Sequence, residues 1–138
     1  MSHSLEFSDL VKYDAGQPGV SLEVEISVSG SSVKLRAKID TGSTNCIFAR
    51  NYGEQLGLDI EDGELVKIGT ATGTFVTYRH FVVLSFLDFR YDAAICFAAD
   101  DSFSRNVLGR SWFLNQVILG LNDYEGSLYL NRLEEEHI

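Results

Sequence analysis

The chain has 138 residues, 45% of them hydrophobic, and a formal net charge of -9 from 20 acidic and 11 basic residues. This length suits one domain, and the hydrophobic content is enough for a compact core, which excludes wholesale disorder. The acidic balance disfavours nucleic acid as a partner, because phosphate binding requires a basic face.

Cysteine usage and the N-terminal residues bear on the compartment. Cys46 and Cys96 each lie in an apolar context, which favours two buried free thiols over a disulfide-stapled secreted domain. Residues 1–13 lack the apolar segment of a signal peptide, and no apolar run is long enough to span a bilayer. We therefore expect a cytoplasmic protein without a membrane partner.

Composition along the chain predicts three parts. Residues 1–18 are polar, hold the only proline, Pro18, and are expected to form a flexible N-terminal arm with at most a short strand. A single folded domain is expected over 19–133. The acidic segment 134–138 is expected to be a solvated tail.

The first elements of the predicted domain are a hairpin and a short helix. Apolar residues alternate over 21–28 and 33–39, and the Ser/Gly segment 29–32 between them predicts a turn, so the two runs predict a β-hairpin. Further on, 49–56 is expected to form a short helix that ends at Gly57.

The middle of the chain is rich in β-branched and aromatic residues. Strands are predicted over 64–68, 74–86 and 89–97. The small residues of 69–73 separate the first two of these strands and predict a flexible connection.

The last third continues the β pattern. A short apolar segment at 107–109 precedes one or two predicted helical turns at 110–114, and a final hairpin is expected from 117–122 and 127–131. Many short strands with turn signals and little helix predict an all-β barrel or sandwich.

The acid that ends the second predicted strand is the strongest functional signal. Asp40 follows an alternating apolar run and is followed at once by Thr41, Gly42 and Ser43. Small residues rich in hydrogen-bonding groups suit a carboxylate held by backbone N–H groups in a partly dry cleft, where its pKa can be tuned. Taken alone, the motif also fits an Asp that only caps a turn.

Three segments, in order, resemble the retropepsin-like aspartic proteases, the single-domain relatives of retroviral protease. They are the Asp-Thr-Gly-Ser signature at 40–43, a glycine-rich segment at 68–75 similar to the family's flap hairpin, and the Asn-Val-Leu-Gly-Arg element at 106–110. The resemblance runs from about Leu22 to Leu130. It implies a closed β-barrel of the acid protease type with one or two short helices, and the C-terminal hairpin is closer to cellular and bacterial relatives.

The resemblance also implies roles for individual residues. Asp40 would be the catalytic acid and base, Thr41 would hydrogen-bond across a dimer axis, and Gly42 would let the backbone approach the carboxylates and the substrate. The residues expected to bind substrate are Ser43, Gly69, Thr70, Ala71, Thr72 and Gly73. Those expected to support the active-site loop are Leu108, Gly109 and Arg110.

The sequence contains one Asp-Thr-Gly motif, whereas activation of water between carboxylates needs two acids that share a proton. Two chains would each supply one Asp40, which predicts a homodimer with a two-fold axis through the active site. We expect an aspartic endopeptidase that hydrolyses peptide or protein substrates without a cofactor. The histidines are too scattered to suggest a metal site.

Two departures from the family pattern keep alternatives open. Thr44 and Asn45 stand where retroviral enzymes have an acid that pairs with the arginine, and Ser111 stands where Asp or Asn is usual. A catalytically inactive binding or dimerisation module on the same fold is one alternative. A monomeric small-ligand β-barrel is another.

Overall fold

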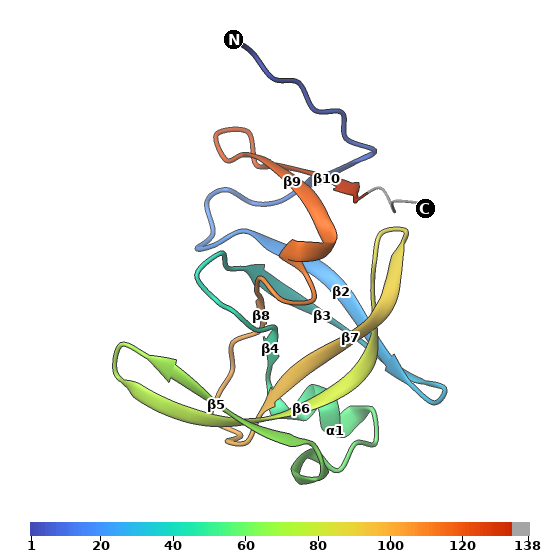
Figure 1. Ribbon diagram of the computed structural model, residues 1–138, viewed down its shortest axis with the longest axis vertical. Helices are drawn as coiled ribbons and strands as arrows, with labels where there is room; N and C mark the ends of the chain where they lie inside the picture. Colours follow the sequence, from blue (N-terminus) through green and yellow to red (C-terminus); the bar gives the residue numbers. More distant parts are fainter. Residues whose placement is uncertain (134–138) are drawn as a thin grey trace.

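The structure, a computed structural model, describes residues 1–133, so the tail predicted at 134–138 lies outside the described residues. Figure 1 shows the elements. In chain order they are β1 (Asp9–Lys12), β2 (Ser21–Val28), β3 (Ser31–Ile39), β4 (Ile47–Phe48), α1 (Arg50–Gln55), the 3-10 helix η1 (Ile60–Asp62), β5 (Glu64–Thr70), β6 (Gly73–Phe86), β7 (Phe89–Ala98), β8 (Val107–Leu108), the 3-10 helix η2 (Leu114–Gln116), β9 (Val117–Asn122) and β10 (Ser127–Arg132).

Most strands belong to one sheet that curves back on itself. The seven-stranded sheet has the order β2-β3-β8-β4-β7-β6-β5, and β2 also pairs with β6, which makes the sheet ring-like and leaves β5 on its outer edge. The β2–β6 pairing covers Glu25 to Ser27. The predicted all-β class is therefore confirmed, whereas full closure into a barrel stays a prediction.

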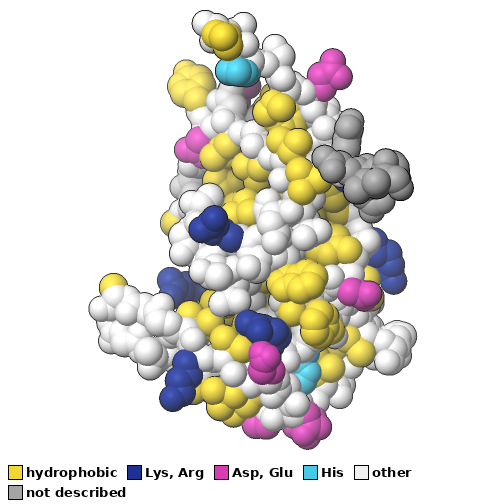
Figure 2. Space-filling model, in the orientation of Figure 1, with side chains coloured by type: hydrophobic (Ala, Val, Ile, Leu, Met, Phe, Trp, Pro, Cys, Tyr) yellow, Lys and Arg dark blue, Asp and Glu magenta, His cyan; other side chains and the backbone are white. Residues whose placement is uncertain are grey.

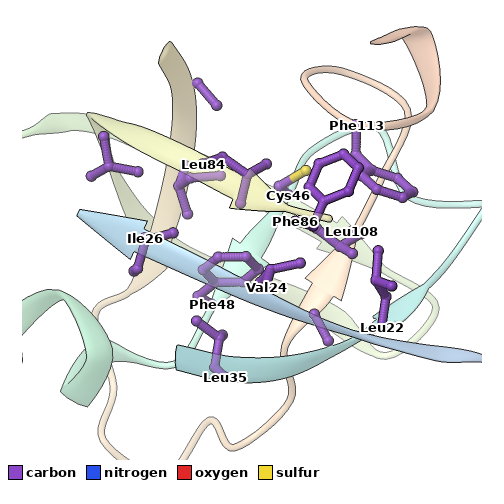
Figure 3. Packing of buried hydrophobic residues seen from close by; sticks show 14 of the residues in the cluster. Leu22, Val24, Ile26, Leu35, Cys46, Phe48, Leu84, Phe86, Leu108 and Phe113 are labelled. Atoms are coloured by element: carbon purple, nitrogen blue, oxygen red, sulfur yellow. The ribbon is translucent and has the colours of Figure 1, made fainter. Parts of the chain in front are cut away.

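The alternating residues of the predicted hairpin form one wall of the core. Leu22, Val24 and Ile26 of β2 are at most 2% exposed. They pack in one cluster with Leu35 of β3 and with the large aromatic side chain of Phe48 (Figure 3). Because successive side chains of a strand point to opposite faces, this burial sets the direction in which β3 leaves the core and enters the Asp40 turn.

A smaller sheet stands beside the ring and has the order β1-β10-β9. Its β10 residues Leu128 and Leu130 are fully buried, so this sheet joins the same core. Strand β1 lies within the predicted arm, where Leu10 is paired with Tyr129. The division into arm, domain and tail stays a prediction, with this part of the arm held in a sheet.

The helix predicted at 49–56 is present as α1, and Gly57 after it adopts a φ of +82°. The helical turns predicted at 110–114 are wrong, because this segment forms irregular turns and the 3-10 helix η2 starts at its end. Trp112 has a φ of +75°, which a right-handed helix cannot contain, and its carbonyl accepts a 2.6 Å hydrogen bond from the Tyr91 hydroxyl. No helix within residues 1–133 has the length and apolar character needed to cross a membrane.

Candidate active site

The Asp40 turn is oriented by its own backbone and anchored on β8. One carboxylate oxygen of Asp40 accepts a hydrogen bond from the Gly42 N–H at 2.8 Å. The Asp40 carbonyl accepts one from the Ser43 N–H at 3.2 Å, and the Asp40 N–H donates to the Leu108 carbonyl at 3.0 Å. The side chain and the main chain of the acid are therefore both held.

The rest of the loop is bonded to the segment that follows β8. The Arg110 N–H donates to the Ser43 carbonyl at 2.8 Å, and the Ser111 N–H donates to the Thr44 carbonyl at 2.8 Å. The Ser43 hydroxyl donates to the Asn45 carbonyl at 2.7 Å. The Arg110 side chain is exposed and has no carboxylate within 4.0 Å in residues 1–133, so its backbone, rather than an ion pair, supports the loop.

Gly109 lies where the two segments cross. A Cβ atom at this position would lie 2.3 Å from the Asn45 carbonyl oxygen and 2.6 Å from that of Ser43, so no larger residue fits without moving the backbone. Its N–H donates to the Cys46 sulfur at 3.4 Å, and the Cys46 thiol donates to the Ser111 carbonyl at 3.4 Å. Burial raises the pKa of the Cys46 thiol to about 11, which keeps this donor protonated.

The environment of Asp40 differs from the expectation. Asp40, Thr41 and Gly42 are all exposed in the single chain. The partly dry surroundings predicted for the carboxylate are therefore wrong for one chain alone, because nothing in residues 1–133 covers the open side of the turn.

The exposed turn opens into a cleft of about 450 Å³ between the Asp40 loop, the β5–β6 hairpin and the segment before β8. The residues that line it are Asp40, Gly42, Ser43, Thr44, Asn45, Ile47, Lys67, Ile68, Gly69, Thr70, Phe75, Phe103, Arg105 and Val107. Of the six predicted substrate-binding residues, Ser43, Gly69 and Thr70 belong to this lining. The residues 71–73 do not.

The glycine-rich segment forms the tip of a hairpin, as its resemblance implies. Strands β5 and β6 pair without interruption to Thr70 and Gly73, which leaves Ala71 and Thr72 as a two-residue loop. The Thr70 hydroxyl donates to the Gly73 carbonyl at 3.0 Å. The tip is exposed and projects from the ring at the left of Figure 1.

One wall of the cleft was missed by sequence reasoning. The rings of Phe75 and Phe103 stack with their centroids 5.0 Å apart, and the guanidinium carbon of Arg105 lies 5.9 Å from the Phe103 centroid. Lys67 lines the same cleft from β5. A two-residue turn in the sequence could have indicated that Phe75 lies opposite Ile68. The segment 98–106, which carries Phe103 and Arg105, has the composition of an ordinary polar loop and gave no such signal.

Metal chemistry has no evident site in this part of the chain. Within residues 1–133, no group of three His, Cys, Asp or Glu side chains is placed to hold a metal ion. The Nε2 atom of His80 is instead 2.8 Å from the Ile60 carbonyl oxygen.

Comparison with known proteins assigns the family. The aspartyl protease family matches residues 24–112, which is more than half of the chain and includes all three motifs. No curated protein matches. Among solved structures, EIAV protease complexed with the inhibitor HBY-793 is similar at 19% identity and a TM-score of 0.56, over 72% of this chain and 88% of that one, a likeness that shows the fold. The chain belongs to the aspartyl protease family and has a retropepsin-like fold.

Proposed function

We propose that this protein is an aspartic endopeptidase that acts as a homodimer and hydrolyses peptide bonds in peptide or protein substrates. One observation carries the proposal: in a chain of the aspartyl protease family, the Asp40 carboxylate is oriented by its turn and faces a cleft beside the β5–β6 hairpin. A peptide in that cleft would have the acid on one side and the hairpin on the other.

The site of a single chain is half of what the chemistry requires. Among the described residues 1–133, Asp40 is the one acidic residue that lines the cleft. Two carboxylates at close range cannot both ionise at low cost, so a pair shares one proton and offers a base and an acid together. A second copy related by a two-fold axis would bring its own Asp40 and would cover the exposed side of the turn.

In this mechanism the ionised Asp40 takes a proton from water as the water oxygen attacks the carbonyl carbon of the peptide. The protonated Asp40 donates to the carbonyl oxygen, so that charge does not build up on it. Thr41 would brace the two turns across the axis, and Gly42 would leave room for the substrate backbone. The β5–β6 hairpin would close over the peptide and exclude water.

The proposal is tested by Asp40→Asn, a change of nearly equal size that removes the acid. General acid–base groups contribute roughly 10²- to 10⁴-fold to rate, and we expect a loss of kcat of at least about 10³-fold because both halves of the pair are replaced. Asp88→Asn is the matched control, since Asp88 is exposed in the β6–β7 turn outside the cleft lining and should leave kcat unchanged.

Sedimentation of both variants shows whether the assembly is retained. A dimer with activity in Asp88→Asn and none in Asp40→Asn is the expected result. Undiminished cleavage by Asp40→Asn, or a wild-type protein that is active yet monomeric at every concentration, contradicts the proposal. Peptide binding without products would support the non-catalytic module instead. The cytoplasmic location and the lack of a nucleic-acid or membrane partner stay predictions from the sequence.

A further inference from the structure

Two basic side chains share the cleft with Asp40. Lys67 reaches it from β5 and Arg105 from the segment before β8. Neither has a carboxylate within 4.0 Å in residues 1–133, where the ion pairs involve Arg50 and Arg79 outside the cleft. In the part of the chain that the structure describes, the cleft lining thus holds two cations and one acid, although the net charge of the whole sequence is -9.

Arg105 is exposed and lies beside the aromatic pair of the cleft. Its guanidinium carbon lies 5.9 Å from the centroid of Phe103, whose ring is stacked on Phe75, a contact that favours this position of the group. The next residue, Asn106, accepts hydrogen bonds at 2.9 Å from the Ala49 N–H through its side chain and from the Lys38 N–H through its carbonyl. The residue next to Arg105 is therefore bonded both to Ala49, which precedes α1, and to β3.

The space-filling view agrees with this distribution of charge. Figure 2 shows basic side chains where the projecting β5–β6 hairpin meets the body of the molecule, and no acidic side chain on the visible face of the projection. Charges separated by more than about 8 Å are largely screened at physiological ionic strength. Acids farther away than this distance therefore weaken the positive charge of Lys67 and Arg105 only a little.

On the basis of the proposed function, we propose that Phe75, Phe103 and Arg105 form a subsite for an acidic side chain, and that the enzyme prefers peptides with glutamate beside the scissile bond. The methylene groups of glutamate would lie on the stacked rings, and its carboxylate would accept hydrogen bonds from the Arg105 guanidinium. Lys67 would add a second positive charge from β5. A basic side chain would be repelled there.

The test uses end-blocked octapeptides that carry Glu or Gln at each position in turn, at about pH 6, where a peptide glutamate with an ordinary pKa of about 4.3 is ionised. At one position next to the cleaved bond, we expect kcat/KM to be at least about tenfold higher for Glu than for Gln, as for a charge-assisted hydrogen bond. This preference should shrink as salt is raised.

Two variants that each replace an arginine by a glutamate test whether the preference for Glu peptides arises at Arg105. Arg105→Glu should remove the preference for Glu and favour a Lys peptide. Arg90→Glu is the control, because Arg90 is exposed on β7, outside the cleft lining, and should keep the wild-type preference. A Gln peptide with a free C-terminal carboxylate tests whether the carboxylate of a chain end can replace that of the glutamate side chain. Cleavage of this peptide as fast as that of the end-blocked Glu peptide would overturn the side-chain subsite.

Failure of the subsite and failure of the proposed function give different results. Cleavage without a Glu preference, or an equal preference in both variants, overturns the subsite and leaves the protease. If no peptide is cleaved, fluorescence anisotropy of the same labelled peptides decides: binding of Glu peptides that Arg105→Glu abolishes supports the subsite while the proteolytic function falls. Absence of both cleavage and selective binding overturns both.

Discussion

The Asp40 loop and the β5–β6 hairpin line the same cleft but are built in opposite ways. The loop is crossed by backbone hydrogen bonds from the segment after β8, and Gly109 has no room for a Cβ atom. The hairpin tip is exposed, and a Cβ atom on Gly69 would meet nothing within 4 Å. Glycine therefore serves close packing in the first region and an open backbone in the second, as the proposed mechanism requires of a fixed acid and an adjustable cover.

The largest expected effect is that of Gly109→Ala on stability. The new methyl group would collide with two backbone carbonyl oxygens that cannot move without breaking the loop, so we expect a loss of about 3 kcal/mol or more in the free energy of unfolding. Urea denaturation followed by circular dichroism measures it. A loss below about 1 kcal/mol would show that the loop is not interlocked in the way described.

The next effect is an alkaline loss of stability that depends on Cys46. Its pKa is raised from 9.0 to about 11 in the folded protein, so the folded state keeps a proton that the unfolded state releases. The contribution of this protonated thiol to the free energy of unfolding is complete below pH 9 and is lost as the pH rises towards 11. The loss is about 1.4 kcal/mol per pH unit and roughly 2 to 3 kcal/mol in all.

Free energies of unfolding of the wild type and of Cys46→Ala, measured from pH 7 to pH 10.5, test whether the thiol causes a loss of stability as the pH rises. The variant is less stable at neutral pH because it leaves a small cavity, and the gap between the two proteins should narrow as the pH rises. Parallel curves over the whole range would contradict the assignment of the alkaline loss to this thiol.

Removal of one hydroxyl group from each region should give smaller losses of stability, which can be compared directly. Ser43→Ala removes a half-buried donor to the Asn45 carbonyl, and we expect a loss of about 1 kcal/mol. Thr70→Val removes the exposed donor to the Gly73 carbonyl, where water can replace it, and the loss should stay within about 0.5 kcal/mol. Thermal unfolding of both variants makes the comparison, and equal losses would remove the distinction between the two regions.

Gly69→Ala should have the smallest effect on stability. The methyl group enters open space, so the free energy of unfolding should stay within about 0.5 kcal/mol of wild type. Because alanine has fewer backbone conformations than glycine, closure of the hairpin over a peptide should be impeded, and kcat/KM should fall several-fold. Loss of stability without any change in kinetics would show that the hairpin is a packed element rather than a cover.

Local pattern was sufficient for much of the fold. Period-two alternation predicted β2 and β3 almost to their ends, because burial on one face of a strand repeats every second residue. The β-branched and aromatic residues of 74–86 predicted the long strand β6. Gly57 marked the end of α1 through its positive φ. The Asp-Thr-Gly-Ser motif located the turn after β3, because small residues and an acid at a strand end form that turn by themselves.

Other features depend on contacts that no local pattern carries. The helical turns expected at 110–114 are replaced by a turn around Trp112, whose carbonyl is bonded to Tyr91 on a neighbouring strand. The strand β1 is held by β10, from the other end of the chain. Tertiary contacts outweigh local preference in both cases, since the backbone groups find their partners far away in sequence.

The amino-acid sequence by itself determined most of the strands and the Asp40 turn, because each depends on neighbouring residues, and three short motifs in order indicated the family. Only the tertiary structure decided how firmly the acid is held and what surrounds it. The hydrogen bond from Gly109 to Cys46 joins residues 63 positions apart, and the stacked Phe75 and Phe103 come from separate segments. Packing, strand register and exposure arise when such distant segments meet, and they place Asp40 in an open cleft with a basic and aromatic wall.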